Sequence, residues 1–471
     1  MNLQGKTVLV LGMGETGLSM VKWLSRMDAK VRVADSRLNP PNWDVLVKMF
    51  PTIPVFKGQF ETKIFEDIEL IAVSPGVPLA EPCVKQAQLS GIPIVGDITL
   101  FISALNSDDR PRPRILTITG SNGKTTVTAM VGAMLKEAGW DVEVAGNIGP
   151  AVLDVLMQRM DAGQLPQAWV LEISSFQLET AESLNADVAT VLNISEDHLD
   201  RYVGMSDYAA AKARIFQHEM EGCGVQVLNR EDPEVCAMAL MDRRKVYFGS
   251  GVPDIESDFG LQHDGDETWL MEGSKCLMKS TELAVNGLHN LLNALAALAL
   301  CRALGVPVEP LVVALRKFRG LPHRMEKVAA FNGVTFYDDS KSTNVGATVA
   351  ALKGMKQNVV LIAGGDGKGQ DFTILKDAVA DYTRAVVLIG RDAGKISAVL
   401  EGCGVPVYLA ETMQEAMQKS FLLAQTGDVV MLSPACASFD MFRNYVHRAE
   451  VFVAAVKDVE SKFIGFGQKE H

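Results

Sequence analysis

The sequence has no excess of basic residues and no cysteine pairs at the spacing of metal or redox sites. Lysine and arginine number 45 against 57 aspartates and glutamates, which gives a formal net charge of −12. Proteins that bind nucleic acid over a wide surface carry the opposite balance, so we expect no nucleic-acid partner. The seven cysteines are odd in number and none forms a C-x-x-C pair, which argues against a disulfide framework and a zinc site and fits a reducing compartment.

Long apolar runs are also missing. The longest, around residues 294–301, is well short of the ~18–20 residues that a membrane span needs. The apolar stretch at residues 7–11 turns directly into glycines and Glu15, which is typical of a β-strand and not of a signal peptide. We therefore expect a cytoplasmic protein without a membrane partner, and a monomer.

What the sequence does have is an alternation of short β-branched runs with longer helical patterns, typical of parallel α/β sheets. At ~150 residues per domain, 471 residues predict about three domains. A polar, proline-broken segment at 106–114 is interpreted as a linker, and 247–286 as a small antiparallel insert. The predicted α/β domains are a Rossmann-like domain over 1–105, a central P-loop-type ATPase domain over 106–320 and a Rossmann-like domain over 321–471.

The first motif is Gly12-x-Gly14-x-x-Gly17, placed between a predicted strand and a predicted helix. Such glycines allow a tight turn and a close approach of the backbone to a phosphate at the helix N-terminus. Asp35 follows at the end of the next predicted strand, where an acid that contacts a ribose would lie. The motif indicates a nucleotide phosphate without specifying the nucleotide, and a glycine turn without a ligand stays an alternative.

The second motif is TITGSNGKTT at 117–126, again between a strand and a helix. Backbone amides there can surround phosphates, Lys124 can reach them, and a threonine hydroxyl can bind Mg²⁺. Ile118 occupies the position of the first glycine of the general P-loop pattern. The segment nevertheless predicts ATP binding.

Further chemical groups follow predicted strands. Glu172 and His198 come at strand ends, where ligands of open α/β sheets collect, and both suit Mg²⁺ or Mn²⁺. Taken singly, each is more often structural than a ligand. Cys436 is interpreted as a buried thiol. The last domain adds Arg324, Asp339, Lys341, Thr343 and Lys368, and Ser438 at a predicted helix start whose free amides would bind a small carboxylate.

Taken together, these motifs resemble the Mur ligases, and within them the branch that adds D-glutamate to UDP-N-acetylmuramoyl-L-alanine. The resemblance covers the whole chain and its segments follow the family's order. They are GMGETGLS, SPG, GDITLF, TGSNGKTT, GNIG, LEISSFQLE, NISEDHLDR, AAKARIF, HNLLNALAAL, GLPHRME, DDSKSTNVGAT, GGDGKG and SPACASFD.

The resemblance assigns the first motif to the UDP part of the substrate instead of a dinucleotide. Glu15 departs from the apolar residue that the family commonly has there. The residues implied to contact the UDP substrate are Thr16, Asp35, Ser36, Arg37, Ser74, Gly76, Asn147, Gln177 and His198.

The central domain resembles the ATPase unit of the family. The resemblance implies two Mg²⁺ sites, with Thr125, Glu172, His198 and a carbamate that CO₂ forms on Lys212 as ligands. Without the resemblance, Lys212 on its alanine-rich helix would be interpreted as an ordinary surface lysine. The implied ATP-binding residues are Gly120, Ser121, Asn122, Gly123, Lys124, Thr125, Thr126, Asn293, Arg324 and Asp339, and the implied catalytic residues are Lys124, His198, Lys212 and Lys341.

In the third domain, the positions that match the D-glutamate site of the family are Thr343, Lys368, Ser438, Phe439 and Tyr445. The implied activity is ATP-dependent amide-bond formation through an acyl phosphate, in peptidoglycan precursor synthesis. Alternatives are a Mur ligase for another amino acid, a folylpolyglutamate synthetase-like ligase, a nicotinamide-dependent dehydrogenase and a non-enzymatic ATP-binding module.

Overall fold

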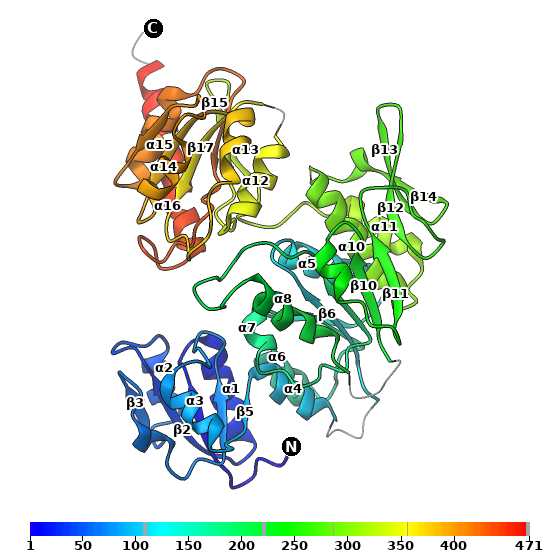
Figure 1. The fold of residues 1–471 in the computed structure, drawn as a ribbon, viewed down its shortest axis with the longest axis vertical. Coiled ribbons are helices and arrows are strands. Elements are labelled where there is room, and N and C mark those ends of the chain that lie inside the picture. Colours follow the sequence, from blue (N-terminus) through cyan, green and yellow to red (C-terminus); the bar gives the residue numbers. More distant parts are fainter. Residues whose placement is uncertain (107–110, 219–222, 286, 356, 468–471) are drawn as a thin grey trace. The chain divides into compact units, whose positions relative to one another are not determined.

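The computed structural model describes residues 1–106, 111–218, 223–285, 287–355 and 357–467. The chain packs into two compact units. Unit 1 comprises Met1–Ile194, Ser206–Met278 and Ala294–Leu315, and unit 2 comprises Ser195–Met205, Lys279–Asn293 and Arg316–His471. Three separate sheets confirm the predicted three-domain α/β fold (Figure 1). The boundaries at 105/106 and 320/321 stay predictions, and residues 107–110 of the predicted linker lie outside the described residues.

The first sheet of unit 1 is parallel, in the order β3-β2-β1-β4-β5. Its central strand β1 (TVLVL) is apolar and almost entirely buried, as expected for a strand covered on both faces. Its elements are β1 (Thr7–Leu11), α1 (Glu15–Arg26), β2 (Lys30–Asp35), α2 (Trp43–Met49), β3 (Val55–Lys57), β4 (Leu70–Val73), α3 (Pro82–Leu89) and β5 (Ile94–Val95).

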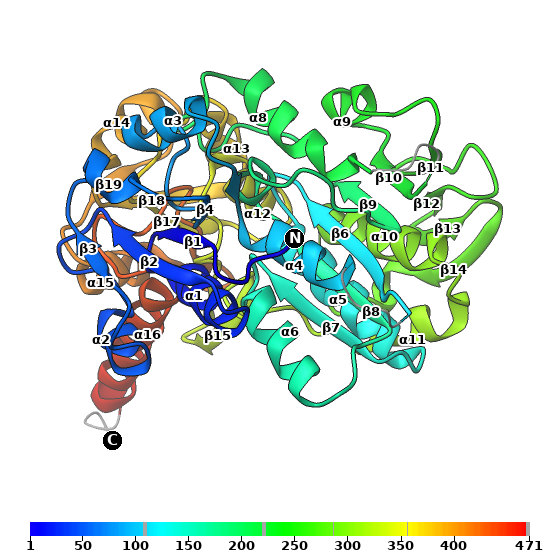
Figure 2. The same cartoon turned by 90° about the horizontal axis from the view of Figure 1, so that it is seen from below.

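The second sheet has the order β14-β13-β12-β11-β10-β9-β6-β8-β7. The antiparallel pairing of β12 with β13 confirms the predicted insert, which extends the parallel part of the sheet. Helix α5 packs on β6, β7 and β8 (Figure 2). The first elements are α4 (Asp97–Asn106), β6 (Arg114–Thr119), α5 (Lys124–Glu137), β7 (Val142–Gly146), α6 (Val152–Asp161), β8 (Ala168–Glu172), α7 (Ser175–Leu178) and β9 (Val188–Val191). The remainder are α8 (Met205–Ala213), β10 (Val225–Asn229), α9 (Pro233–Ala237), β11 (Arg244–Phe248), β12 (Phe259–Asp264), β13 (Glu267–Glu272), β14 (Lys275–Lys279), α10 (Leu288–Ala303) and α11 (Val308–Lys317).

The third sheet lies in unit 2, in the order β15-β16-β20-β17-β18-β19. Only the edge pair β15–β16 of this sheet is antiparallel, and β17 (VVLIAG) is buried at every position. Its elements are β15 (Glu326–Phe331), β16 (Val334–Asp338), α12 (Val345–Lys353), β17 (Val359–Gly364), α13 (Leu375–Tyr382), β18 (Thr383–Ile389), α14 (Ala393–Leu400), β19 (Val407–Leu409), α15 (Met413–Leu423), β20 (Val429–Leu432) and α16 (Tyr445–Gly467).

Candidate functional site

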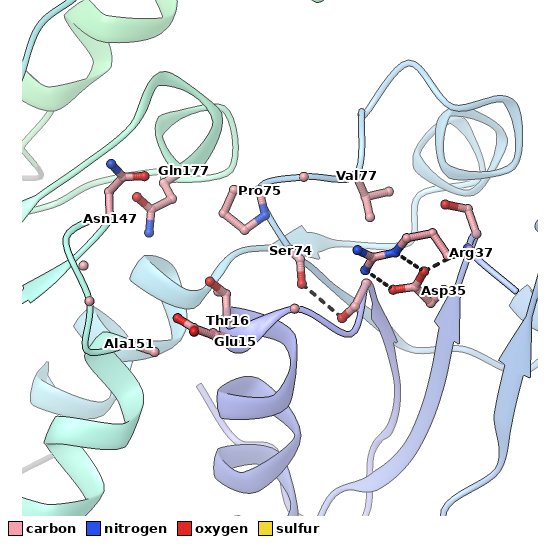
Figure 3. Close-up of a pocket in the computed structure, with 16 residues that line it drawn as sticks. Glu15, Thr16, Asp35, Arg37, Ser74, Pro75, Val77, Asn147, Ala151 and Gln177 are labelled. Carbon is pink, nitrogen blue, oxygen red and sulfur yellow. Dashed lines mark hydrogen bonds and ion pairs between the residues drawn. The ribbon is translucent and has the colours of Figure 1, made fainter. Parts of the chain in front are cut away.

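A cavity of about 450 Å³ opens in unit 1 beside the N-terminus of α1 (Figure 3). The glycine turn, the ends of β2 and β4, and two loops of the second sheet line it. All but one of the residues implied to contact the UDP substrate are among these lining residues. They are Thr16, Asp35, Ser36, Arg37, Ser74, Gly76, Asn147 and Gln177. His198 is the exception, because it belongs to unit 2.

The glycine turn packs α1 tightly against the first sheet. Gly12 has a φ of +91°, a region that favours glycine, and Ser74 Oγ donates to its carbonyl oxygen at 3.2 Å. A Cβ on Gly17 would lie 1.8 Å from the same carbonyl oxygen, so no other residue fits there without a shift of the backbone. The backbone amides at the start of α1 thereby border the cavity, a favourable place for an anion. Glu15, the first residue of α1, lines the same cavity.

Asp35 and Arg37 form a closely bonded pair in the cavity wall (Figure 3). Arg37 Nε donates to Asp35 Oδ1 at 2.8 Å, and Met13 N donates to Oδ2 at 2.7 Å. Burial raises the pKa of Asp35, but the hydrogen bonds from Arg37 and Met13 outweigh it and hold the pKa below its usual value. Both carboxylate oxygens have protein partners, and 53% of the Arg37 side chain stays exposed. This arrangement favours Asp35 as the residue that orients Arg37 over a direct ribose contact.

Gln177 projects into the cavity from the start of α7 and is held on three sides. Its Oε1 accepts from Ser174 N at 3.1 Å and from Ser174 Oγ at 3.2 Å. Its Nε2 donates to Asp97 Oδ2 at 3.0 Å. Burial raises the pKa of Asp97 to about 6. Asp97 lies within the GDITLF segment, but a lone aspartate at a helix start is ordinarily interpreted as a cap, so its local sequence does not mark it as a site residue.

The TITGSNGKTT segment forms a loop between β6 and α5, with Gly120 and Gly123 at positive φ. Lys124 Nζ donates to the carbonyl oxygens of Gly120 at 2.7 Å and Ser121 at 2.9 Å, so its ammonium group lies over the loop. The loop shape is fixed from outside by Asn193, which accepts from Ser121 N at 2.9 Å and from Asn122 N at 2.8 Å.

Lys212 lies under the same loop and is only 1% exposed. Its Nζ donates to Gly120 O at 2.9 Å and to Thr119 Oγ1 at 3.3 Å, and it lies 4.8 Å from the centre of the Tyr208 ring. The interpretation of Lys212 as a surface lysine, drawn from its helix alone, is therefore wrong. Alanines on α8 let the helix pack closely, and this packing buries the lysine.

Glu172, at the end of β8, has an unsatisfied oxygen. Its Oε1 accepts from Asn147 Nδ2 at 2.7 Å, while Oε2 is buried without a hydrogen-bond partner among the described residues. Buried carboxylate oxygens rarely remain unpaired, and a divalent cation is a natural partner for one. The site residues present therefore fit Mg²⁺, with Thr125 buried at the start of α5 as an oxygen donor.

In unit 2, the loop that carries His198 packs on the Gly-rich loop after β17. Asp197 forms an ion pair with Lys368 and accepts from Asn344 Nδ2 at 3.4 Å. His198 has a φ of +56°, and its Nε2 lies 3.6 Å from Asp197 Oδ2. Asp197 adjoins His198, but the local sequence does not mark it as a site residue, because its partners Lys368 and Asn344 are far away in the sequence.

A second cluster of unit 2 follows β16. Asp339 is buried and accepts from Ser342 Oγ at 2.5 Å and from Ser433 Oγ at 2.7 Å. Burial raises its pKa to about 6. Lys341 Nζ lies 5.2 Å from the centre of the Tyr445 ring. The other residues predicted in this region are Asn293, Arg324 and Thr343, each half-buried in unit 2.

The prediction of a helix start at Ser438 is wrong. Ser438 begins a turn in which its carbonyl oxygen accepts from Met441 N at 3.2 Å and from Phe442 N at 2.8 Å. Helix α16 begins only at Tyr445, because Asn444 Oδ1 caps it by accepting from His447 N at 2.8 Å. Ser438 is buried, whereas Phe439 is 74% exposed.

Two further predictions concern the cysteines and membrane-spanning helices. All seven cysteines are free, and Cys436 is buried, with its pKa raised by burial to about 12, as expected for an inert thiol. Among the described residues, no helix has the length and apolar character to cross a membrane.

Comparisons with known proteins agree with this geometry. Residues 6–96 match the description "Mur ligase MurD-like, N-terminal domain", residues 118–301 match "Mur ligase middle domain", and residues 323–436 match "Mur ligase, glutamate ligase domain". A UDP-N-acetylmuramoylalanine–D-glutamate ligase from Nitrosospira multiformis is 62% identical over 99% of this chain and 98% of its own. The Nitrosomonas europaea protein of the same name is 59% identical over 100% of both chains.

Solved structures share the fold at low sequence identity. The UDP-N-acetylmuramate-alanine ligase of Thermotoga maritima has a TM-score of 0.61 at 20% identity, covering 96% of this chain and 99% of its own. The MurF ligase of Thermotoga maritima, solved in complex with ADP, has a TM-score of 0.60 at 15% identity, covering 97% of this chain and 96% of its own. Site geometry, matched domains and full-length relatives lead to one conclusion. The chain belongs to the Mur ligase family.

Proposed function

We propose that the protein is an ATP-dependent ligase that joins D-glutamate to UDP-N-acetylmuramoyl-L-alanine, in peptidoglycan precursor synthesis. The observation that carries the proposal is the cavity of unit 1, where the residues implied to contact the UDP substrate lie together except His198. The relatives at 62% and 59% identity bear the name of this activity. We further propose that the protein acts in the cytoplasm as a monomer.

The cavity would hold the UDP end of the substrate. Its diphosphate would lie at the N-terminus of α1, where backbone amides favour an anion. The Arg37 guanidinium, oriented by Asp35, would supply positive charge that offsets the acidic balance of the whole chain. Gln177 would offer its second amide hydrogen to an acceptor oxygen of the substrate, because its other polar positions are already bonded.

The loop between β6 and α5 would bind the phosphates of ATP. Lys124 would leave the carbonyl oxygens of Gly120 and Ser121 for the phosphate oxygens, which bind an ammonium group more strongly. The other proposed ATP-binding residues are those that the resemblance implies. They are Gly120, Ser121, Asn122, Gly123, Thr125, Thr126, Asn293, Arg324 and Asp339.

The proposed reaction has two steps. First, an oxygen of the L-alanine carboxylate attacks the γ-phosphorus of ATP, the bond to the β-phosphate oxygen breaks, and ADP leaves. Second, the amine of D-glutamate attacks the acyl carbon, the carbon–oxygen bond to phosphate breaks, and the nitrogen loses a proton. Lys124 and Lys341 would stabilise the negative charge that develops on the transferred phosphoryl group.

Mg²⁺ would occupy two proposed sites, one held by Thr125 and Glu172 and the other by His198, with Mn²⁺ as a substitute. When bound, it would neutralise phosphate charge. The orphaned Oε2 of Glu172 is the observation that supports a metal there.

Lys212 is proposed to carry a carbamate. After its ammonium group loses one proton, the neutral nitrogen would add to CO₂ and lose a second proton, which replaces a buried ammonium by an anionic oxygen donor. Mass spectrometry under bicarbonate should detect the mass of one CO₂ on the peptide that contains Lys212. Full activity in bicarbonate-free buffer, together with an unmodified Lys212, would contradict the carbamate.

D-Glutamate would bind in unit 2 at Thr343, Lys368, Ser438, Phe439 and Tyr445. Lys368 is paired with Asp197 in this structure, so a substrate carboxylate would compete with that carboxylate for the ammonium group. The side-chain carboxylate of D-glutamate would form charge-assisted hydrogen bonds that an amino acid with an uncharged side chain cannot form.

The decisive experiment measures phosphate release from ATP in the presence of UDP-N-acetylmuramoyl-L-alanine, with D-glutamate, L-glutamate, L-alanine or glycine as the acceptor. We expect turnover with D-glutamate and at most trace turnover with the others. Lys124→Ala should abolish turnover, whereas Lys136→Ala, an exposed lysine on the same helix, should leave it unchanged. Equal turnover with all acceptors would contradict the D-glutamate assignment, and full activity of Lys124→Ala would contradict the ATP site.

A further inference from the structure

Arg448 is a fully buried arginine in the first turn of α16, and none of the site assignments above uses it. Its side chain is 0% exposed and is among the largest buried side chains of the described residues. Arginine is almost never fully buried unless it is paired, because loss of water around a charge is costly. Burial lowers its pKa to about 10, so the guanidinium stays charged at neutral pH.

The partners of Arg448 are neutral oxygens on two different loops. Nε donates to Ser340 Oγ at 3.1 Å, and Nη2 donates to Ser340 O at 2.8 Å. Nη1 donates to Cys436 O at 3.0 Å. Within the part of the chain that the structure describes, no carboxylate lies within ion-pair distance of this guanidinium. The hydrogen bonds to these loops, together with the negative charges of Asp338, Asp339 and Asp440 beyond ion-pair distance, therefore offset the burial of the charge.

Both loops leave the third sheet at the same edge, which is formed by the carboxyl ends of its parallel strands. The first follows β16 and the second follows β20, and these two strands are parallel neighbours. Ligands of open α/β sheets collect at this edge. The guanidinium bridges the two loops through Ser340 and Cys436. Ser340 Oγ also connects the first loop to α16, because it donates to Tyr445 O at 2.8 Å.

The bridged segments contain most of the residues proposed to bind D-glutamate. Thr343 and the catalytic candidate Lys341 follow Ser340 in the first loop, and Ser438 follows Cys436 in the second. Tyr445 is the first residue of α16. One planar group thus fixes the spacing of three segments that meet in this proposed site, through bonds whose directions are set by the guanidinium plane.

We propose that Arg448 is a positioning residue for the amino-acid substrate, acting through Ser340 and Cys436. The proposal rests on the function proposed above and names the group that holds its D-glutamate site together. Arg448 does not touch the substrate. It fixes the loop that leads to Ser438 relative to the loop of Ser340, whose hydroxyl bonds to Tyr445.

The test compares Arg448→Lys and Arg448→Met with a matched control, Arg384→Met. Lysine keeps the charge but cannot reach Ser340 and Cys436 with a planar fork, and methionine removes both charge and donors. Arg384 lies in the same unit and pairs with Asp428, so its loss disturbs unit 2 away from the two loops. The readouts are KM for D-glutamate, kcat at saturation, the thermal midpoint and the Kd for UDP-N-acetylmuramoyl-L-alanine.

We expect Arg448→Lys to raise KM for D-glutamate by about tenfold and Arg448→Met by about a hundredfold, because misplacement by about 1 Å has effects of that size. In Arg448→Lys, KM for D-glutamate should rise by a larger factor than kcat falls, and the Kd for the UDP substrate should not change, because its cavity lies in unit 1. Arg384→Met should lower the thermal midpoint without raising KM. If Arg448→Met does not fold, Arg448→Lys alone decides.

Two results would overturn the positioning role of Arg448 without affecting the proposed function. They are a KM for D-glutamate within about twofold of the parent in Arg448→Lys, or an equal rise of this KM in Arg384→Met. In both cases, D-glutamate-dependent phosphate release by the parent protein would leave the proposed function intact. Absence of that release in the parent would overturn the proposed function, and the positioning role with it.

Discussion

Single residues of this protein carry charge in places where water is scarce. Asp97 accepts one hydrogen bond from Gln177, while its other oxygen is buried without a partner among the described residues. Its ionised form is therefore poorly solvated, which is why its pKa is raised to about 6. Asp97 also orients the side-chain amide of Gln177 in the proposed substrate cavity. The protein therefore gives up part of its free energy of unfolding at neutral pH and keeps this binding group in place.

Asp97 should make unit 1 less stable as the pH rises. The pKa of Asp97 is about 6 in the folded state and 3.8 in the unfolded chain, so the folded state binds the proton more tightly. Its contribution is fully present below pH ~4 and is lost as the pH rises through about 6, which amounts to about 3 kcal/mol. Asp97→Asn keeps an acceptor for Gln177 and does not titrate. Its free energy of unfolding, measured by urea unfolding, should gain on that of the parent by about 2 kcal/mol between pH 4.5 and 7.5, because part of the loss in the parent has already occurred at pH 4.5.

The control for this pH dependence is Asp161→Asn. Asp161 pairs on the surface with Arg26, and the hydrogen bond from Arg26 lowers its pKa, so its contribution to stability is lost as the pH falls. Between pH 4.5 and 7.5 Asp161 is largely ionised in both the folded and the unfolded state, so the difference between Asp161→Asn and the parent should stay nearly constant there. A free-energy difference for Asp97→Asn that stays constant with pH would contradict the role given to burial.

For single residues, the sequence is informative where a motif specifies the position of the residue in the fold. The structure brings the eight predicted residues together around one cavity, and most of them belong to a recognisable segment, while their contact with a substrate stays a prediction. Lys212 and Arg448 show why the rest could not be found from local pattern. An arginine or lysine on a helix is ordinarily solvated, and only tertiary packing buries these two.

Among the elements, the turn between β1 and α1 places the proposed phosphate site. Its geometry depends on how closely α1 approaches the Gly12 carbonyl oxygen, which leaves no room for a Cβ at Gly17. Gly14 in the same turn has open space around its Cα and a φ of −72°, which alanine adopts readily. Two glycines of one motif therefore have different physical tasks.

Gly17→Ala should destabilise unit 1 by about 3 kcal/mol, because the added methyl group would push α1 away from β1. It should also weaken binding of the UDP substrate, whose cavity includes the start of α1. Gly14→Ala should change the free energy of unfolding by less than about 1 kcal/mol. Urea unfolding and calorimetric titration measure both effects. Equal destabilisation by the two substitutions would show that the clash at Gly17 is relieved without cost.

The secondary structure follows from local pattern in most places. Apolar β-branched runs such as TVLVL and VVLIAG form buried strands, because only a strand covered on both faces buries every position. The start of α16 was misplaced because SPACASFD has suitable residues for a helix start near Ser438. A side-chain cap at Asn444 competes with them and sets the actual start.

At the scale of the whole molecule, the two units have separate apolar cores. One set of core clusters lies within residues 3–235, in unit 1, and the other lies within residues 334–459, in unit 2. The sequence predicts three domains, and three sheets form. It does not predict that residues 195–205 and 279–293, both inside the predicted central domain, pack with the C-terminal sheet, because that grouping depends on contacts distant in sequence.

The separate cores make a final prediction possible. All five tryptophans (Trp23, Trp43, Trp140, Trp169 and Trp269) lie in unit 1, so tryptophan fluorescence reports the unfolding of that unit, whereas calorimetry reports both. UDP-N-acetylmuramoyl-L-alanine at about 100 times its Kd should stabilise unit 1 by about 2.7 kcal/mol, because it binds only the folded cavity. The unfolding midpoint measured by fluorescence should rise. The calorimetric transition of unit 2, which has no accompanying fluorescence change, should keep its midpoint. D-Glutamate alone should leave the fluorescence midpoint unchanged, since its proposed site lies in unit 2. A rise of the fluorescence midpoint with D-glutamate alone, or an equal shift of both transitions with the UDP substrate, would mean that the two units unfold as one.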